Sequence, residues 1–547
     1  MNSYDTIIIG AGSAGCVLAA RLGEDAARRI LLLEAGGEDK HWLLHLPLGV
    51  GKVWNDPRWN WSFRSEPEPH LDNRRIDHPR GKVVGGSSTI NIMAYVRCHR
   101  LDYDRLPQMG LQGWSFADVL PYFKRSEGFD EGGDAYRGGS GPLKTRKNLT
   151  DDPVYDAFIG AARELGYRVN EDYNAAEQEG FARLQHTIGN GRRSSAAVAY
   201  LRPAMKRGNI ALETNALATR ILFDGPRAIG IEYMKGGQRC EARAEDQIIL
   251  AGGAFNSPQL LLLSGIGPAD ELRVLGIEPR VDLKGVGKNL WNHPVLATQW
   301  LRAKHGAFHR GLRLDRLLPS LAQAYLFGTG FATRVPAMGT AFTKSAPDLE
   351  APDLQYFLGG GGFLAREWFP LVHPAMPDVF GLTYCHLRPE SRGKLLLQSS
   401  DPAAAPRIFN NFLATDYDRR AMREGLKFAL RTVEETKAFA GLAKSRVLPG
   451  ADVKTDNEMD AYIRANTATI HHPAGTCKIG TDAMAVVDPE FRVRGTERLR
   501  VIDASIMPDP IGGNLNAPVI MIAEKASDMI RGRKPLPPEE VAGHPKL

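Results

Sequence analysis

Two segments near the end of the chain carry side chains suited to proton transfer or to hydrogen bonding of an oxygen. One is Ile470-His471-His472-Pro473-Ala474-Gly475-Thr476, and the other is Asn514-Leu515-Asn516. A neutral imidazole can accept a proton near pH 7, and an asparagine amide can hydrogen-bond an oxygen without changing its charge. Because neighbouring side chains diverge along an extended chain, one histidine faces a given point. We predict that one of the two histidines is functional and that the other supports it by packing, with a buried core histidine as the alternative.

A strand, a glycine turn, a helix and a second strand open the sequence. Thr6-Ile7-Ile8-Ile9 leads into Gly10-Ala11-Gly12-Ser13-Ala14-Gly15, a helical pattern covers residues 16–22, and residues 30–33 end at Glu34. Glycines at this spacing allow a tight turn and close approach to a pyrophosphate, and the following helix start offers donors to phosphate. Glu34 stands where a carboxylate accepts hydrogen bonds from a ribose. The unit predicts a dinucleotide site and leaves FAD and NAD open.

Two more glycine-rich stretches could lie against such a cofactor. Gly81 to Asn91 holds small residues and backbone donors, and a strand at 247–250 runs through Gly252-Gly253 into a helix. An ordinary loop is the alternative for the first stretch. Between about 300 and 465 the apolar segments are short, which predicts an antiparallel region covering the cofactor.

Length and composition are those of a large folded enzyme. The chain has 547 residues, 43% hydrophobic and 24% charged, with a net charge of +6. This length exceeds one compact core, and the charge does not require a nucleic acid partner. Five cysteines without C-x-x-C spacing predict no disulfide framework and no metal site. No apolar run reaches the ~18 residues of a spanning helix, and no signal-peptide pattern opens the sequence, so we expect a cytoplasmic protein.

Basic residues gather between 304 and 316. They are Lys304, His305, His309, Arg310, Arg313 and Arg316. A solvated loop is the ordinary interpretation. Contact with a membrane surface or with an anionic substrate is the alternative.

From its first strand to its last helix the chain resembles the glucose-methanol-choline family of FAD-dependent oxidoreductases. Residues 81–91 resemble the first family signature, residues 253–267 the second, and residues 472–476 and 514–516 the catalytic segments. The resemblance implies an α/β fold with a Rossmann-like FAD-binding domain and a substrate domain built on an antiparallel sheet with helices.

Two positions depart from the family pattern. Cys98 stands where a small residue is usual, and Asn292-His293-Pro294 replaces the commoner Asp-His-Pro. We expect neither departure to affect the chemistry. We predict domain ranges of 1–298 for FAD binding, with some cap segments included, 299–464 for the substrate, and 465–535 for a segment that returns to the FAD domain with His472 and Asn514.

The resemblance also implies roles for individual residues. His472 accepts the hydroxyl proton with Asn514 as its partner, and hydride passes to the flavin. Some members tether FAD through a histidine where this chain has Ile90, so we expect non-covalent FAD. Asn516 is expected to cap the last helix in part, and the start of that helix to favour the reduced flavin. The residues expected to contact FAD are Gly10, Gly12, Ser13, Ala14, Gly15, Glu34, Ala35, Val84, Gly85, Ser88, Asn91, Ala218, Asp503, Ala504 and Asn516.

Within the family, the chain resembles the branch of choline dehydrogenases and aliphatic alcohol dehydrogenases. Choline requires an anion or an aromatic box, yet residues 335–342 carry no acid and the basic cluster would repel a cation. We therefore expect oxidation of a neutral, largely apolar primary alcohol to its aldehyde. Choline dehydrogenase and an oxygen-using alcohol oxidase are alternatives, and an FAD-containing hydroxynitrile lyase is one from another class.

The sequence says less about which residues form the walls of the substrate pocket and about the identity of the electron acceptor. Candidate walls are Met338, Phe357, Phe363, Trp368 and Phe369, although each is also an ordinary core residue type. We expect a quinone or another electron acceptor, met at the inner membrane face if the protein docks there. The oligomeric state is left open.

Overall fold

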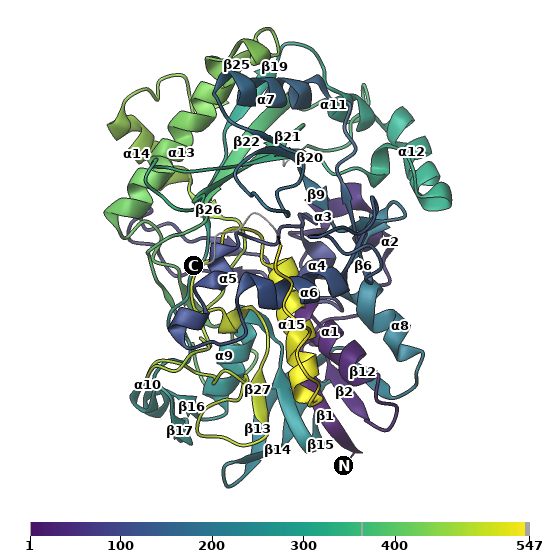
Figure 1. Cartoon of the computed structure of the whole chain (residues 1–547), viewed down its shortest axis with the longest axis vertical. Coiled ribbons are helices and arrows are strands. Elements are labelled where there is room, and N and C mark those ends of the chain that lie inside the picture. The colour runs from purple at the N-terminus through teal and green to yellow at the C-terminus, as the bar shows by residue number, and fades with distance from the viewer. Residues whose placement is uncertain (1, 363–364, 542–547) are drawn as a thin grey trace.

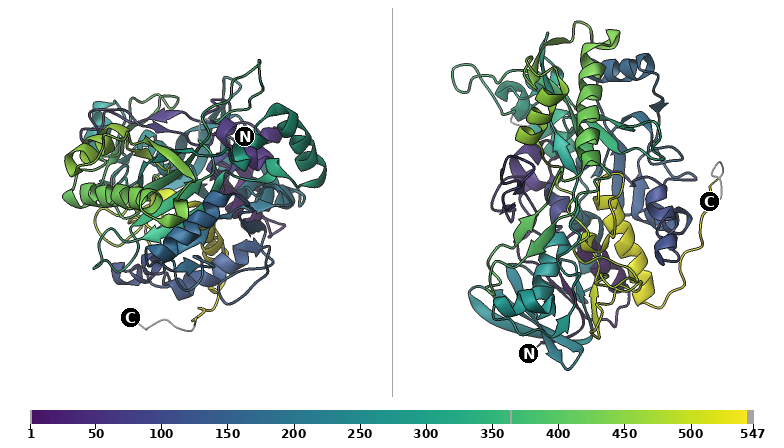
Figure 2. Two further views of the ribbon diagram at one scale, coloured as in Figure 1. Left: turned by 90° about the horizontal axis from the view of Figure 1, so that it is seen from above. Right: turned by 90° about the vertical axis from the view of Figure 1, so that its left-hand side faces the viewer.

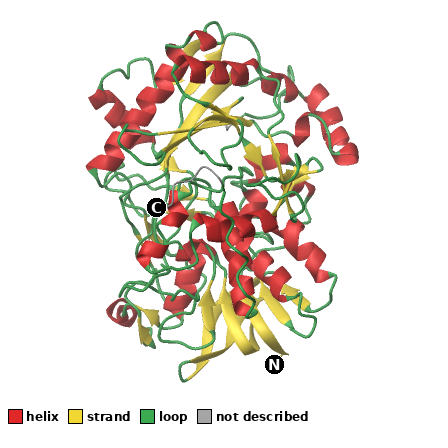
Figure 3. Ribbon diagram, viewed as in Figure 1, coloured by secondary structure: helices red, strands yellow, loops and turns green. Residues whose placement is uncertain are grey.

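The computed structural model describes residues 2–362 and 365–541. Two β-sheets lie at opposite ends of an elongated molecule, with most helices between and around them (Figure 3). Figure 2 shows the same elongated shape from the side, with the N-terminus at one end. Among the described residues, no helix is long and apolar enough to cross a bilayer.

The first sheet has a five-stranded parallel core. In order across the sheet these strands are β12 (Ile210–Glu213), β2 (Ile30–Leu33), β1 (Asn2–Ile9), the end of β15 (Gln238–Leu250) and β27 (Leu499–Val501). The inner strands carry apolar runs at their carboxyl ends, and Ile7 and Ile8 are fully buried, as a sheet covered on both faces requires. β14 (Arg227–Lys235) pairs antiparallel with β15, and β13 (Ala216–Asp224) pairs antiparallel with β14.

Helices from the two ends of the chain pack together beside this sheet. α1 (Ser13–Leu22) follows the first glycine turn, and α15 (Asn516–Ile530) is the last helix. They contact each other along their length, and Figure 1 shows them side by side above the strands. α9 (Gly253–Leu263) starts directly after β15. All three helices therefore begin at the carboxyl ends of parallel strands, where open α/β sheets bind ligands.

The second sheet is mostly antiparallel. Its main path is β25 (Ala443–Leu448), β19 (Gln299–Arg302), β22 (Val379–His386), β21 (Leu354–Gly359), β20 (Ala337–Thr343), β8 (Gly180–Arg183) and β7 (Val169–Asn170). α7 (Pro153–Glu164) and α13 (Asp416–Glu434) pack on it and bury a second core that includes Phe158, Phe181 and Phe428. This is the predicted α/β architecture with an antiparallel substrate region.

The chain crosses between the two layers several times, and cap segments lie within the predicted FAD-binding range. β7, β8 and β18 (Pro294–Leu296) belong to the second sheet but lie within residues 1–298, and β26 (Ala468–Thr469) lies within 465–535. β18 and β26 pair antiparallel, with Pro294 opposite Thr469. This pairing brings the residue before β18, His293, close to the segment after β26, which carries His472.

Candidate active site

The first glycine turn is shaped by contacts that exclude side chains. Gly10 has φ +100°, and a Cβ there would lie 2.5 Å from the carbonyl oxygen of Ala251. A Cβ on Gly15 would lie 1.9 Å from the carbonyl oxygen of Gly10, so this glycine lets α1 pack on the strand. A Cβ on Gly12 would meet the carbonyl oxygen of Ala251 at 3.9 Å, an ordinary contact, and Gly12 gives α1 no side-chain cap. The first amides of α1 are thus free to bind an anion.

Glu34 closes one end of the cavity that this turn lines. Its buried carboxylate accepts hydrogen bonds from the backbone N–H groups of Ala11 (3.0 Å) and Gly36 (2.8 Å). Burial raises the pKa of Glu34 to about 7, although the two N–H groups oppose this shift. The carboxylate keeps unused lone pairs, so it can also accept hydrogen bonds from sugar hydroxyls.

The second glycine-rich loop lies directly on the first. Gly85 N donates to Ala11 O (2.7 Å), and Val84 N donates to Gly37 O (3.0 Å). Gly86 has φ +54°, and a Cβ on it would lie 2.7 Å from Gly12 Cα. Val84 and Gly85, with Gly15, therefore hold the loops together and do not line the cavity, which differs from their predicted contact with FAD.

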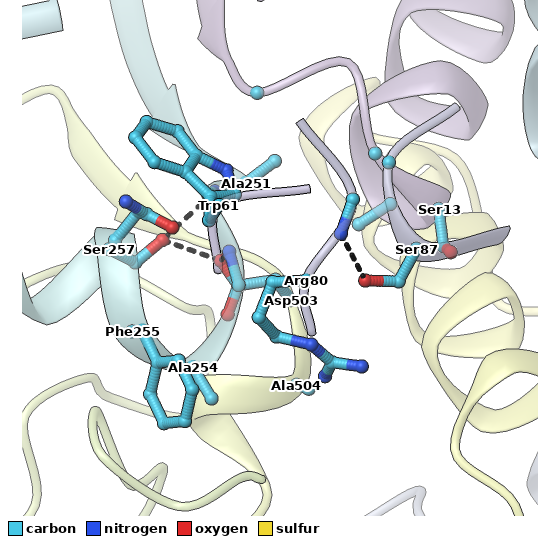
Figure 4. Close-up of a pocket in the computed structure, with 18 of the residues that line it drawn as sticks. Ser13, Trp61, Arg80, Ser87, Ala251, Ala254, Phe255, Ser257, Asp503 and Ala504 are labelled. Carbon is cyan, nitrogen blue, oxygen red and sulfur yellow. Dashed lines mark hydrogen bonds between the residues drawn. The ribbon is translucent and has the colours of Figure 1, made fainter. Parts of the chain in front are cut away.

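The other residues predicted to contact FAD line one continuous cavity. They are Gly10, Gly12, Ser13, Ala14, Glu34, Ala35, Ser88, Asn91, Ala218, Asp503, Ala504 and Asn516, and His472 and Asn514 line the same cavity. Figure 4 shows part of it, with Asp503 hydrogen-bonded to Ser257 on one side and Ser13 and Ser87 on the other. The cavity thus runs from an acid suited to ribose, past two helix starts, to a histidine and an asparagine.

Asn516 links two helices instead of capping one. Leu515 occupies the N-cap position of α15 without a side-chain hydrogen bond, and Asn516 Oδ1 accepts from Ser13 Oγ (2.8 Å). The expected partial cap at Asn516 is therefore absent, because its side chain is used by α1. Both helix starts, α1 and α15, turn unsatisfied amides and positive dipole ends toward the cavity.

The reactive end is a directional chain of hydrogen bonds. Asn514 Nδ2 lies 3.1 Å from His472 Nε2, and His472 Nδ1 lies 3.0 Å from His293 Nδ1. Gln355 Nε2 lies 3.4 Å from Asn514 Oδ1. These four side chains come from the α15 loop, the segment after β26, the residue before β18, and β21.

This chain fixes which nitrogen of His472 carries the proton. In the amide orientation that lets Gln355 donate to Asn514 Oδ1, Asn514 presents its N–H groups to His472 Nε2, so Nε2 is an acceptor. A neutral imidazole has one N–H, which must then be on Nδ1, where it donates to His293. His472 therefore points a lone pair toward Asn514 and the cavity, as a general base needs.

Burial keeps His472 neutral. Loss of hydration lowers the pKa of His472 well below its usual value, and the nearby His293 and Arg80 lower it further. Burial also lowers the pKa of His293 to about 3. Neutral His293 can accept the Nδ1 proton of His472, because its own Nδ1 carries the lone pair in the Nε2–H tautomer.

The two departures from the family pattern lie beside the catalytic segments. Asn292 Oδ1 accepts hydrogen bonds from His472 N (3.0 Å) and from Thr469 Oγ1 (3.0 Å). Cys98 Sγ is 3.9 Å from the carbonyl oxygen of Asn514. The expectation that neither position bears on the chemistry is therefore too simple, since both touch the backbone that carries the catalytic side chains.

Several residues of the site lack a motif that would have singled them out. Arg80 lines the cavity, and burial lowers its pKa to about 10; in the described part of the chain no carboxylate pairs with it. It is free to meet an anionic group of a ligand. Arg193, fully buried, donates to both the backbone and side-chain oxygens of Asn91 and so positions that residue. Gln355 and Arg193 lie in ordinary sheet and loop segments. Arg80 stands directly before the Gly81–Asn91 stretch, and this position is the one sequence signal that could have found it.

Apolar side chains surround the catalytic end. Ile90, Ile92, Met93, Ile470 and Trp54 line the cavity, together with His471. The His471 ring meets Trp54 edge-on, with centroids 4.6 Å apart. His471 thus supports the site by packing, as predicted, but it also faces the cavity, because φ +65° turns the backbone between the two histidines.

Four of the five candidate walls lie elsewhere. Phe357 packs behind Ile92 and Ile470, and Met338 packs in the core of the second sheet. Trp368 and Phe369 stack near Arg313 at the outer edge of the molecule. Phe363 lies outside the described residues. The sequence did not reveal these positions, since an aromatic residue carries no signal of which cavity it faces.

Comparison with known proteins agrees with this geometry. Two family models, both described as GMC oxidoreductase, match this sequence, one over residues 4–295 and the other over residues 389–523. It is 41% identical to the mitochondrial choline dehydrogenase of Homo sapiens, over 98% of this chain and 91% of that protein. It is 42% identical to the oxygen-dependent choline dehydrogenase of Sinorhizobium fredii, over 97% of this chain and 96% of that one.

Solved structures give the same result. Pyridoxine 4-oxidase from Mesorbium loti superposes with a TM-score of 0.86 at 30% identity, over 97% of this chain and all of that one. Formate oxidase superposes with a TM-score of 0.90 at 25% identity, over 97% and 98% of the two chains. Members of the family bind FAD, and the glycine cradle, Glu34 and the two open helix starts fit that cofactor. With a base-competent histidine at the far end of such a cradle, the chain belongs to the GMC oxidoreductases and is a FAD-dependent enzyme that oxidises CH–OH groups.

Proposed function

We propose that the protein oxidises a neutral, largely apolar primary alcohol to its aldehyde and passes the electrons to a quinone-type acceptor. The observation that carries the proposal is the chain Gln355–Asn514–His472–His293, which leaves a lone pair on His472 Nε2 facing an apolar cavity. FAD, when bound, supplies the hydride acceptor.

The chain's own residues handle the proton and the orientation. His472 Nε2 takes the hydroxyl proton, while Nδ1–H stays bonded to His293 and keeps the ring in place. Nε2 has a single lone pair, so the alcohol O–H takes the place of the Asn514 N–H at that atom, and Asn514 Nδ2 then donates to the alcohol oxygen. Holding that oxygen between the two side chains fixes the direction of the carbon whose hydride leaves.

We further propose that FAD is bound without a covalent link. Ile90 lines the cavity in the glycine-rich loop and offers no nucleophilic atom. Binding would then rest on the backbone donors at the start of α1, on Glu34 and on Arg80. Acid precipitation should release all the flavin into the supernatant, and flavin that stays with the protein would contradict this.

The charges around the cavity support a neutral substrate. Among the described residues that line it, the acids are Glu34 and Asp503, and both carboxylates are engaged by backbone N–H groups. Neither belongs to the hydrogen-bonded chain that contains His472. A quaternary ammonium group would therefore have aromatic contacts with Trp54 and Trp61 but no free carboxylate.

Choline is the second candidate substrate, because the curated relatives at 41–42% identity are named choline dehydrogenases. Trp54 and Trp61, which both line the cavity, could supply the aromatic faces such a cation requires. The relatives also leave two acceptors open, since one of them is named as oxygen-dependent. Our proposal of a quinone places the reoxidation step at a membrane surface.

A flavin spectrum under anaerobic conditions tests these proposals. The purified protein is mixed in turn with 1-octanol, benzyl alcohol and choline, and the His472→Ala variant serves as the matched control. We expect bleaching by the two neutral alcohols, and bleaching by choline alone would overturn the substrate proposal. A water-soluble quinone should then restore the oxidised spectrum faster than air, whereas equally fast recovery in air would identify an oxidase.

A further inference from the structure

An exposed helix at the outer edge of the molecule carries its apolar side chains outward. α12 (Leu314–Phe327) buries Leu317, Ser320 and Ala324 against the protein. Leu318, Tyr325, Leu326 and Phe327 are instead 61%, 69%, 67% and 73% exposed. Positions 315, 318, 322, 325 and 326 share one helical face, which holds an aspartate in the first turn and then leucine, alanine, tyrosine and leucine. Figure 1 shows α12 as the outermost helix at the upper right.

A tight turn beside α12 adds two more apolar side chains. Trp368 pairs with the start of α12 through Trp368 N to Leu312 O (3.2 Å) and Leu314 N to Trp368 O (3.0 Å). Phe369 and His373 then pair through their backbones and close a turn, whose tip carries Leu371 and Val372. Leu371 is fully exposed and Val372 is 62% exposed. Six large apolar side chains therefore project from neighbouring segments.

Basic side chains border these apolar groups. Lys304, Arg310 and Arg316 are exposed, and Arg313 lies between α12 and the turn, near the rings of Trp368 and Phe369. The acid of α12 is Asp315, which pairs with Arg313 (3.0 Å). Of the basic cluster seen in the sequence, His309 is buried, whereas Lys304, Arg310 and Arg316 are exposed.

We propose that α12 and the turn at residues 370–372 form a docking surface for an anionic lipid bilayer. We call this surface the α12 face. Its apolar side chains enter the headgroup region, while Lys304 and Arg310, in the segment before α12, lie at the level of the lipid phosphates. A second copy of the chain fits less well, because the same cations would meet each other across a symmetric contact.

The α12 face is joined to the wall of the cofactor cavity. After α12 the chain forms η4 (Phe331–Thr333), which contacts η1 (Pro47–Gly49), and η1 leads through α3 (Val50–Val53) to Trp54 at the cavity. Docking through this face would bring that side of the cavity near the lipid phase, where a lipophilic quinone resides. This consequence rests on the proposed function, whereas the docking surface itself does not.

Vesicle co-sedimentation tests the proposal with the FAD-loaded protein. The vesicles are pure phosphatidylcholine, or phosphatidylcholine mixed with phosphatidylglycerol. We expect binding to the mixed vesicles that weakens as salt is added. The Leu318→Ser/Leu326→Ser variant should lower the partition coefficient by about tenfold or more. The Lys304→Gln/Arg310→Gln variant should lose the preference for phosphatidylglycerol.

Val274→Ser is the matched control. Val274 is 84% exposed at the end of α10 (Ala269–Val274), at the other end of the molecule, so this variant should bind vesicles like the unmodified protein. Flavin content and dye-linked alcohol oxidation without lipid should be unchanged in all variants, which separates this test from that of the proposed function. Equal vesicle binding by the leucine variant would overturn the proposal. So would a dimer in light scattering that this variant converts to monomers.

Discussion

The two ends of the cavity recognise their ligands in different ways. The cofactor end uses backbone groups, and its glycines from Gly10 to Gly15 lie in one continuous turn. The reactive end uses side chains, and His293, Gln355, His472 and Asn514 come from four separate segments. Binding a common cofactor requires the removal of side chains at one place, whereas moving one proton requires a hydrogen-bonded chain assembled by the whole fold. Substitutions at the cofactor end should therefore mainly change the affinity for FAD, and substitutions at the reactive end should mainly change turnover per bound flavin.

The largest effect should follow His472→Ala. Removing a general base lowers kcat by about 10²–10⁴-fold, and the cofactor cradle should remain intact because it does not depend on this ring. Turnover per bound flavin and the flavin-to-protein ratio are the measurements. Loss of flavin together with activity would mean that His472 is structural and would remove the separation of the two ends.

Gly86→Ala should produce the opposite pattern. Its Cβ would lie 2.7 Å from Gly12 Cα at φ +54°, and such strain costs about 1–3 kcal/mol, so FAD should bind about 10–100-fold more weakly. Turnover per bound flavin should stay within about twofold of the unmodified protein.

Gly113→Ala is the control for that change. Gly113 has a similar φ of +77° but no atom within 4 Å of its Cβ position. It should lose some stability and keep its affinity for FAD in equilibrium titration. Equal weakening of FAD binding by both variants would show that backbone strain alone, and not the contact between the two loops, is responsible.

His293→Leu tests whether the reactive end works as a chain. The Nδ1–H of His472 would lose its acceptor in a buried site, which should lower kcat about tenfold and leave KM nearly unchanged. His293→Asn, which restores an acceptor, should recover part of the rate. A shift in the acid limb of the kcat profile is the second readout, and an unchanged profile with an unchanged rate would limit His293 to packing.

Glu34→Gln should lower the affinity for FAD less than Gly86→Ala does. In the protein without FAD it should raise the thermal stability. The pKa of Glu34 is raised from 4.5 to about 7 in the folded state, so its contribution to stability is present below about pH 4.5 and lost as the pH rises to about 7. The variant should therefore gain thermal stability relative to the unmodified protein between pH 5 and pH 7.5 when FAD is stripped. Its affinity for FAD should fall about fivefold, and a stability difference that does not grow with pH would contradict the raised pKa.

The same contrast explains what the sequence could predict. The parallel strands, the glycine turn and Glu34 follow from local patterns, because apolar runs and glycine spacing are properties of neighbouring residues. His472 and Asn514 were found through family motifs. His293 and Gln355 were missed as functional residues, since their roles arise from pairing between β18 and β26 and between β21 and β22. Arg193 was missed because it acts through side-chain hydrogen bonds to Asn91, which lies 102 residues earlier. The projecting α12 face was invisible because the sequence of α12 also suits a buried helix.

The contact between α1 and α15 has a consequence for how the protein is made. Ser13 binds Asn516 (2.8 Å), and Arg21 pairs with the fully buried Glu524 (2.9 Å), so residues about five hundred positions apart meet beside the cofactor site. The last parallel strand, β27, also joins the sheet only near the end of the chain. A ribosome must therefore have synthesised the chain at least through α15 before the cradle can close, and the nascent protein stays without its flavin until that helix emerges.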